Sequence, residues 1–412
     1  MPIRAVSSID PTAGQAGRPG DAAATVWPLC DLPDSTEGVA LYVHWPFCVS
    51  KCPYCDFNSH VRDGVDQDAW REALLADLAH EAALTGANST DKRPLQSIFF
   101  GGGTPSLMPP ATVASVILAA TQAWTPANDL EITLEANPSS VEAANFRALA
   151  DAGVNRVSLG IQALDEETLH FLGRAHGVAE ALAALDTAQA AFPRVSFDLI
   201  TARPGQSLAA WDAELARALS FGTEHLSIYQ LTVEPGTRFA TLLAKGELTE
   251  LEADEAADLL ILTRERAAAA GLPAYEVSNH ARPGAESRHN LQYWRMGDYV
   301  GIGPGAHGRR LRSRTERHKK PENYLRAVSR NGHGIREEAP LDARERTIEI
   351  LLMGLRLTEG VPLSRLPLPE LVDQPAAERL RAHGLLTRNA DRLQATPEGS
   401  MVLNSLLAEL LA

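Results

Sequence analysis

From residue 39 onward, short apolar runs along the chain alternate with longer stretches of helical spacing. The short runs are rich in β-branched and aromatic residues, which favour strands, and the stretches between them repeat apolar positions every three or four residues. The predicted strands are Val39–Trp45, Ser97–Gly101, Leu130–Ala136, Arg156–Gln162, Arg194–Ile200 and His225–Val233. Strands that alternate with helices in this way indicate repeated βα units around a parallel sheet.

The stretch Asp68–Leu84 illustrates the helical pattern, because an apolar stripe runs from Trp70 to Leu78 and only Asp77 interrupts it. Six such units fit before residue 275. Six strands joined by right-handed crossovers can curl into an incomplete barrel that stays open on one side. We therefore expect an α/β fold, a TIM-like (β/α)6 partial barrel, over residues 38–275.

The pattern changes beyond Gly305. A basic run at Arg309–Lys320 gives way to helical stretches at Ala343–Arg356 and Ala376–His383, and then to a short hairpin and a capped helix within residues 384–399. This succession is typical of winged-helix folds. The predicted division is an N-terminal extension (1–37), the partial barrel (38–275), a connecting region (276–340) and a small C-terminal domain (341–412).

Composition and charge limit the functions of the chain. With 45% hydrophobic and 22% charged residues it has the composition of a globular protein, and no stretch reaches the ~20 apolar residues that span a bilayer. The net charge of -14 argues against a nucleic-acid partner, which needs clustered Lys and Arg. We therefore expect the C-terminal domain to pack or act as a lid, and Arg309–Lys320 to form a solvated loop or to hold one anionic ligand.

Residues 1–37 are rich in Ala, Gly, Pro and Ser but lack the apolar core of a secretory signal, and their carboxylates argue against a transit peptide. We expect a disordered extension on a cytoplasmic protein. Three of the four cysteines lie within eight positions, which is typical of a metal site and not of a disulfide framework. The fourth, Cys30, is expected to be a free thiol.

The three clustered cysteines, Cys48, Cys52 and Cys55, follow the first predicted strand, in the loop where barrel folds place their chemistry. Thiolates select iron–sulfur clusters or zinc, and three cysteines in one loop can hold three corners of a [4Fe–4S] cluster. The fourth iron then lacks a protein ligand and can bind S-adenosylmethionine, whose reductive cleavage releases a 5′-deoxyadenosyl radical. The alternative is a zinc site that His44 or His60 completes.

Glycines and polar side chains mark the ends of the following strands. The segment Gly101–Pro105 follows the second strand, and glycines there let backbone N–H groups approach a ligand closely. Polar residues recur towards the same end of the later strands at Glu135, Gln162, Asp198, Tyr229 and Gln230. Such recurrence at one rim predicts a polar nucleoside site.

These segments resemble the radical S-adenosylmethionine superfamily, and within it the oxygen-independent coproporphyrinogen III oxidase group, which includes HemN and the HemW haem chaperones. The resemblance runs from about Tyr42 to the C-terminus. It rests on the motifs Tyr42–Cys48 (YVHWPFC), Gly101–Pro105 (GGGTP), Glu135–Pro138 (EANP), Arg156–Gln162 (RVSLGIQ), Leu172–Arg174 (LGR), Phe197–Ile200 (FDLI), Val233–Thr237 (VEPGT) and Gly301–Ala306 (GIGPGA). The residues that it implies for S-adenosylmethionine are Tyr42, Tyr54, Gly102, Gly103, Thr104, Glu135, Gln162, Arg174, Asp198, Ala306 and His307.

Two features favour the HemW side of this group. The oxidases carry a further cysteine after the third, in a C-x-C arrangement, whereas Cys55 is followed here by Asp56 and Phe57. The segment Arg288–Trp294 (RHNLQYW) matches the H-N-x-x-Y-W motif associated with haem binding in the chaperones. An imidazole can ligate haem iron while neighbouring rings cover the porphyrin. The haem residues that the resemblance implies are His289, Asn290, Tyr293 and Trp294.

Two positions leave these assignments open. His280 is a second imidazole near the motif and could serve as an axial ligand instead. Ala202 stands where the family more commonly has a glycine, in the loop after the fifth predicted strand.

Three functions are compatible with the sequence. The favoured one is a haem chaperone that delivers haem to respiratory or other haem proteins, with the cluster, its electron donor and S-adenosylmethionine serving assembly, regulation or release. The second is a coproporphyrinogen III oxidase, for which Arg309–Arg317 would hold the propionates of the substrate. The third is a structural zinc protein.

Overall fold

The computed structural model describes residues 38–62, 64–85, 92–388 and 391–411, and its centre is an eleven-stranded sheet in the order β13-β12-β11-β10-β1-β4-β5-β6-β7-β8-β9. Six neighbouring strands are parallel and correspond to the six predicted ones: β1 (Val39–Trp45), β4 (Pro94–Gly102), β5 (Thr125–Ala136), β6 (Arg156–Gln162), β7 (Arg194–Thr201) and β8 (His225–Gln230). The predicted α/β partial barrel is confirmed, and the strand bounds differ by a few residues.

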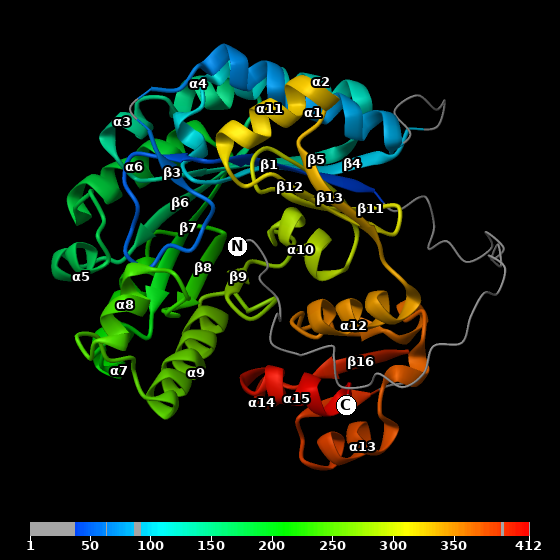
Figure 1. The fold of residues 1–412 in the computed structure, drawn as a ribbon. Helices are drawn as coiled ribbons and strands as arrows, with labels where there is room; N and C mark the ends of the chain where they lie inside the picture. Colours follow the sequence, from blue (N-terminus) through cyan, green and yellow to red (C-terminus); the bar gives the residue numbers. More distant parts are fainter. Residues whose placement is uncertain (1–37, 63, 86–91, 389–390, 412) are drawn as a thin grey trace, which may run out of the picture.

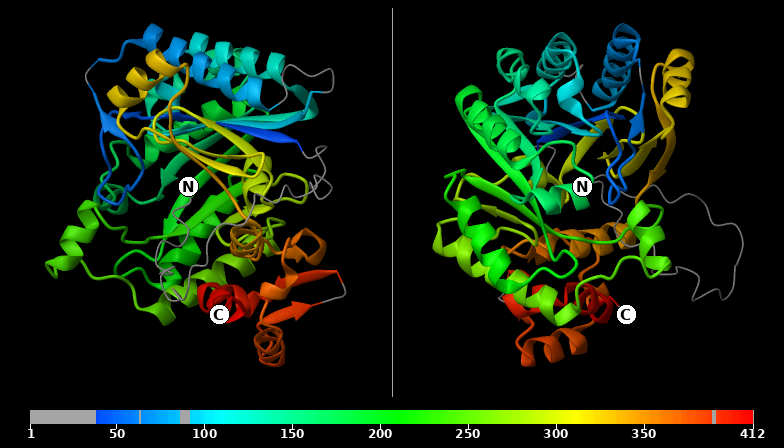
Figure 2. Two further views of the ribbon diagram at one scale, coloured as in Figure 1. Left: turned by 45° about the vertical axis from the view of Figure 1, so that its right-hand side comes forward. Right: turned by 90° about the vertical axis from the view of Figure 1, so that its left-hand side faces the viewer.

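Helices cover the outer face of the curved sheet (Figures 1 and 2). The longer ones are α1 (Gln67–Leu84), α2 (Pro110–Ala123), α6 (Val178–Ala191), α7 (Leu208–Leu219) and α9 (Ala253–Ala269). The shorter elements of this half are β2 (Phe47–Cys48), β3 (His60–Val61), η2 (Pro105–Leu107), α3 (Ser140–Ala143), α4 (Phe146–Asp151), α5 (Glu166–Phe171) and α8 (Arg238–Ala244).

Side chains of the parallel strands alternate between the helices and the inside of the sheet, as the two-residue period of a strand requires. In β1, Leu41, Val43 and Trp45 are buried in the main hydrophobic core, whereas Tyr42 and His44 between them face a cavity. The same alternation in β5, β7 and β8 sends apolar residues outward to the helices and polar residues inward. The outer face of the barrel is therefore apolar and its interior is polar.

Five further strands extend the sheet beyond the predicted six. The strand β9 (Asn279–Ala281) pairs with β8, and β10 (Asp298–Ile302) pairs parallel with β1. The strands β11 (His307–Arg310), β12 (Ser313–Arg317) and β13 (Ile335–Pro340) continue antiparallel from there, and α11 (Pro321–Asn331) connects the last two. The expectation of a solvated loop at Arg309–Lys320 is wrong. Arginines occupy both faces of the hairpin β11–β12, so its sequence shows no polar–apolar alternation.

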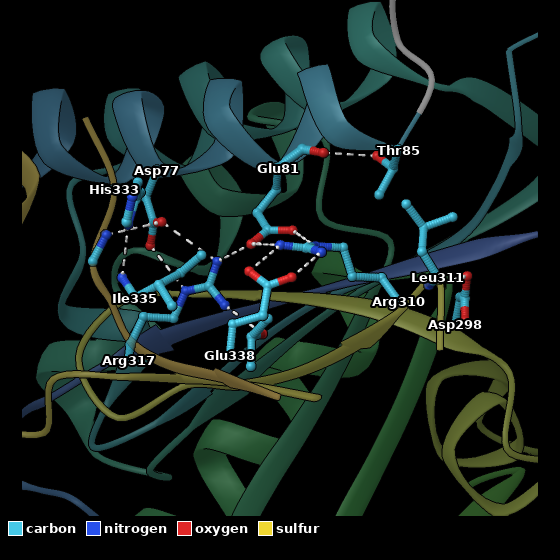
Figure 3. Close-up of polar contacts among 12 residues, drawn as sticks. Asp77, Glu81, Thr85, Asp298, Arg310, Leu311, Arg317, His333, Ile335 and Glu338 are labelled. Atoms are coloured by element: carbon cyan, nitrogen blue, oxygen red, sulfur yellow. Dashed lines mark hydrogen bonds and ion pairs between the residues drawn. The ribbon is translucent and has the colours of Figure 1, made fainter. Parts of the chain in front are cut away.

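A buried network of charges holds this hairpin against α1 (Figure 3). Arg317 is fully buried and donates to Asp77 at 3.2 Å and to Glu81 at 2.7 Å. Arg310 is also buried and pairs with Glu81 and with Glu338. Asp77 interrupts the apolar stripe of α1 because it is the partner of a buried arginine.

The C-terminal part forms a small unit of its own, seen in orange and red in Figure 1. Its helices are α12 (Ala343–Gly354), α13 (Gln374–Ala382), α14 (Pro397–Met401) and α15 (Leu403–Leu410), with η3 (Leu363–Arg365) and η4 (Pro369–Leu371). Its three-stranded sheet has the order β14-β16-β15, formed by Val361–Pro362, Arg392–Ala395 and Leu386–Arg388. Leucines fill a separate core here. This arrangement fits the winged-helix-like expectation.

Two sequence predictions stay predictions. The N-terminal extension (1–37), with Cys30, lies outside the described residues. The domain boundaries at 275 and 340 also remain untested. None of the helices in the described part of the chain combines the length and the apolar character that crossing a bilayer requires.

Candidate functional site

A cavity of about 550 Å³ lies on the inner side of the sheet, which is within the usual range for small-molecule sites. Its walls come from the parallel strands, from the hairpin β11–β12, from α10 (Arg288–Trp294) and from α12. Residues from nearly the whole length of the chain therefore meet at one site, and the C-terminal unit closes one side of it.

The residues implied for S-adenosylmethionine fall into two groups. Those that line the cavity are Tyr42, Gly102, Glu135, Asp198 and His307. Those that do not line it are Tyr54, Gly103, Thr104, Gln162, Arg174 and Ala306. The structure thus brings five of these residues together at the cavity, and part of the second group lies against the cysteine loop.

Glu135 is the acidic centre of the first group. Its Oε2 atom accepts a hydrogen bond of 3.1 Å from the backbone N–H of Gly102. Gly102 has a φ of +115°, and a Cβ there would lie 2.7 Å from the ring of His44, so only glycine fits. Burial, together with the nearby charge of Asp198, raises the pKa of Glu135 to about 7. A carboxyl group of this kind changes its charge near neutral pH.

The cysteine loop between β1 and α1 presents three half-buried thiols, Cys48, Cys52 and Cys55. Thr104 Oγ1 donates to Cys48 Sγ at 3.5 Å, and Arg174 Nη1 donates to Cys52 Sγ at 3.4 Å. Such donors stabilise thiolates. Burial raises the pKa of Cys48 and of Cys55, so these two thiols would release protons on binding iron. The donor set fits a thiolate-bound cluster.

The zinc alternative gains no support from the histidines. The Nδ1 atom of His44 hydrogen-bonds the hydroxyl of Tyr42 at 2.9 Å, and its Nε2 atom hydrogen-bonds the carbonyl of Asn58 at 3.0 Å. Both nitrogens are therefore engaged. His60 Nε2 lies 3.3 Å from the side-chain oxygen of Asn58. Within residues 38–62, 64–85, 92–388 and 391–411, no three His, Cys, Asp or Glu side chains converge as ligands of a single ion.

Arg174 joins the cysteine loop to the strand ends. Its Nη2 atom donates to Asn137 Oδ1 at 2.6 Å and to the carbonyl oxygen of Gly160 at 2.8 Å, while Nη1 reaches Cys52. Gln162, at the end of β6, has a φ of +73°. Three of the motifs that carry the resemblance therefore meet around one guanidinium.

All four residues implied for haem line the same cavity, and they are His289, Asn290, Tyr293 and Trp294. They project from α10. His289 and Tyr293 lie about one turn apart, as do Asn290 and Trp294, so each pair lies on one face of the helix. The side chain of Ser287 caps this helix by accepting from the N–H of Asn290 at 3.3 Å.

His289 sits among aromatic rings. Its ring centroid lies 4.6 Å from that of Phe99, 4.6 Å from that of Tyr293 and 6.0 Å from that of Tyr42. Its Nδ1 atom hydrogen-bonds the hydroxyl of Ser97 at 3.2 Å, whereas its buried Nε2 atom has no partner in the described part of the chain. Burial holds the pKa of His289 well below its usual value, so the imidazole is neutral.

A neutral imidazole with one nitrogen hydrogen-bonded and the other free is the form that ligates metals. The Nε2 atom of His289 is the nitrogen left for such a bond, and it is buried. His280 is fully buried on β9 and does not line the cavity. The structure therefore keeps the second imidazole away from this site.

Sequence reasoning missed several residues of the cavity wall. They are Arg156, His225, Glu276, Tyr299, Glu349 and Arg356. The signal for two of them was present, because Arg156 and His225 occupy the same inward register as Ser158 and Ser227 on β6 and β8. The others come from the connecting region (276–340) or from the predicted helical stretch Ala343–Arg356, where the local sequence gives no sign of a cavity.

Ala202 has a φ of +55°, in the left-handed region that glycine adopts without steric cost. The backbone of this loop thus keeps the conformation that a glycine would favour.

Comparison with known proteins gives matches to two family models. Residues 42–218 match the Radical SAM superfamily, and residues 341–402 match the HemN C-terminal domain. The chain is 38% identical over 389 residues to the "Heme chaperone HemW" of Escherichia coli (strain K12), covering 91% of this chain and 98% of that protein.

It is also 40% identical over 415 residues to the mitochondrial "Radical S-adenosyl methionine domain-containing protein 1" of Bos taurus, covering 97% and 92% of the two chains. Among solved structures, the coproporphyrinogen III oxidase HemN of Escherichia coli superposes with a TM-score of 0.76 at 20% identity, covering 92% of this chain and 91% of that one. This last likeness shows a shared fold.

Proposed function

Because the chain belongs to the radical S-adenosylmethionine superfamily, in the group that contains the HemW heme chaperones, we propose that it binds haem in the cavity and delivers it to haem-requiring proteins. The observation that carries this proposal is the environment of His289. This side chain is a neutral imidazole that lines the cavity, and its Nε2 atom has no partner among the residues that the structure describes. Tyr293 and Trp294 lie beside it.

The same cavity would hold S-adenosylmethionine at its other end. Cys48, Cys52 and Cys55 would hold a [4Fe–4S] cluster, which supplies an electron for cleavage of the sulfonium when a donor reduces it. Glu135 and Asp198 offer acidic groups for the positively charged parts of the nucleoside. Tyr42 belongs to both ends, since its hydroxyl bonds His44 and its ring lies 6.0 Å from that of His289.

The expected partners follow from this function. They are haem, acceptor proteins such as respiratory enzymes, and an electron donor for the cluster. The proposed location is the cytoplasm, on the basis of the cysteine content and the composition of the chain. The Bos taurus relative is described as mitochondrial.

The alternative is oxidative decarboxylation of coproporphyrinogen III. One observation favours it, since Arg309 and Arg314 line the cavity and could hold substrate propionates. Arg310 and Arg317 from the same run are unavailable, because both are buried and paired with acids of α1.

Two assays on one anaerobically reconstituted preparation separate the alternatives. In the first, the protein receives coproporphyrinogen III, S-adenosylmethionine and a reductant. In the second, haem-loaded protein is mixed with apomyoglobin. We expect haem transfer in the second assay and no vinyl-bearing product in the first. A vinyl-bearing product, or failure to retain haem, would overturn the proposal.

A further inference from the structure

Four arginines line the cavity, and one of them differs from the rest. Arg309 pairs with Glu349, Arg314 lies 4.0 Å from Glu337, and Arg156 lies 4.0 Å from Glu131. The guanidinium of Arg356 has neither an ion pair nor a hydrogen bond to any of the residues that the structure describes. It is half-buried on the cavity wall directly after α12.

Arg356 lies beside the residues implied for haem. Its guanidinium carbon is 5.5 Å from the centroid of the Trp294 ring, at cation–π distance, which holds the side chain against the aromatic face of α10. Leu352 and Met353, one turn earlier, line the same part of the cavity. The cation therefore stands at the edge of a surface that suits a flat apolar ring.

The charge of Arg356 is poorly compensated in this position. Burial lowers the pKa of its guanidinium, and the acid that acts on it is Glu276. Glu276 is itself buried, its pKa is raised by that burial, and its carboxylate already accepts from Asn279 and from the N–H of Ser278. A half-buried cation without an anion gains free energy when a carboxylate reaches it.

We infer that Arg356 binds a carboxylate of the cargo, so that the C-terminal unit holds haem by a propionate while α10 contacts the ring. This inference rests on the proposed haem function and names the part of the ligand that is recognised. A planar guanidinium can take a carboxylate through two parallel hydrogen bonds. The carboxylate of S-adenosylmethionine has the same chemistry, and the test separates the two sources.

The test combines a protein change with a ligand change. Dissociation constants for haemin and for haemin dimethyl ester, which lacks both carboxylates, are measured on full-length wild type, Arg356→Gln and Arg356→Lys with intact clusters. The affinity of each protein for S-adenosylmethionine is measured in parallel. Arg295→Gln is the matched control, because Arg295 lies next to Trp294 in the chain but is half-exposed and pairs with Glu359 at 2.8 Å.

We expect Arg356→Gln to weaken haemin binding by about tenfold or more while its affinity for the ester equals that of wild type. Wild type should lose a similar factor on going from haemin to the ester. Arg356→Lys should keep part of the haemin affinity, and Arg295→Gln all of it. Binding of S-adenosylmethionine should not change in any variant.

Four results would overturn the inference in distinguishable ways. If Arg356→Gln binds haemin as wild type does, Arg356 does not bind the carboxylate, and the proposed haem function is unaffected. Equal losses for haemin and the ester assign Arg356 to packing on Trp294. A loss confined to S-adenosylmethionine assigns it to the nucleoside. If wild type binds neither porphyrin, the proposed function fails together with the inference.

Discussion

The two faces of the hairpin β11–β12 carry arginines of one basic run in opposite environments. Arg310 and Arg317 face α1, where acids compensate both of them in a buried network (Figure 3). Arg309 and Arg314 face the cavity. Neighbouring residues of a strand point to opposite faces, so a run that reads as uniformly basic divides into two sets with different roles.

The two sides differ in whether the chain itself supplies the partner of a buried charge. A charge taken out of water needs a fixed partner, and removing that partner is costly. The α1 side meets this requirement within the chain, and it stabilises the edge of the sheet. On the cavity side Arg356 has no acidic partner in the described residues and Glu135 has a pKa of about 7, so these groups can respond to a ligand. Changes on the first side should alter stability, and changes on the second should alter binding.

The largest effect is expected on the α1 side. Arg317→Met removes a fully buried guanidinium and leaves Asp77 without its cationic partner. The free energy of unfolding should fall by about 3–5 kcal/mol in urea titrations monitored by circular dichroism. The control is Arg314→Met, because the Arg314 side chain is 53% exposed. In this variant the free energy of unfolding should fall by less than about 0.5 kcal/mol. Equal losses in both variants would remove the distinction between the two faces.

On the cavity side, pH should act on binding through Glu135. Its pKa of about 7 means that the carboxylate forms between pH 6 and 8, and a carboxylate favours the cationic nucleoside. Affinity for S-adenosylmethionine should therefore rise roughly tenfold from pH 6 to pH 8, measured by calorimetry, and Glu135→Gln should abolish the slope. His44, whose pKa is lowered to about 4, stays neutral throughout. If the affinity of Glu135→Gln still rises with pH, another group is responsible for the pH dependence.

The same pKa has a consequence for stability with the opposite sign. The folded protein holds the Glu135 proton to a higher pH than the unfolded chain does, so this group makes the ligand-free protein less stable as pH rises from about 4.5 to 7. Bound S-adenosylmethionine should offset this loss at the upper end of that range.

The smallest effect is expected at the turn of the hairpin. Leu311 and Arg312 have φ of +50° and +66°, between the paired residues Arg310 and Ser313, which is the two-residue turn that Asn and Gly favour. Leu311 is 55% exposed and has little packing to lose. Leu311→Asn should raise the free energy of unfolding by about 0.5–1 kcal/mol and leave haem affinity unchanged. A destabilised variant would show that Leu311 contributes contacts.

Much of the barrel could be predicted because its strands obey a local rule. Apolar and polar residues alternate in β1 and β7, and the cysteine loop carries its motif in consecutive residues. The hairpin β11–β12 was missed because Arg and Thr occupy its buried face, and only the acids of α1, more than two hundred residues earlier, make that burial favourable. Its position in the sheet also depends on β10 pairing with β1.

The site residues that belong to one sequence motif could be predicted. Those that come together only when distant segments fold were missed. The haem residues of α10 are adjacent in sequence and line one cavity. Arg356 reaches the same cavity from the C-terminal unit, and no local pattern marks it. His280 is close to His289 in sequence, yet the turn between β9 and α10 keeps it out of the cavity.

The most direct test of the central claim compares these two buried histidines. Haem affinity is measured anaerobically for wild type, His289→Ala and His280→Ala, with the cluster absorbance as a control for folding. Because His289 lines the cavity and His280 does not, His289→Ala should weaken haem binding at least tenfold and alter the haem spectrum, while His280→Ala should bind as wild type does. Unchanged haem affinity and spectrum in His289→Ala would contradict the account.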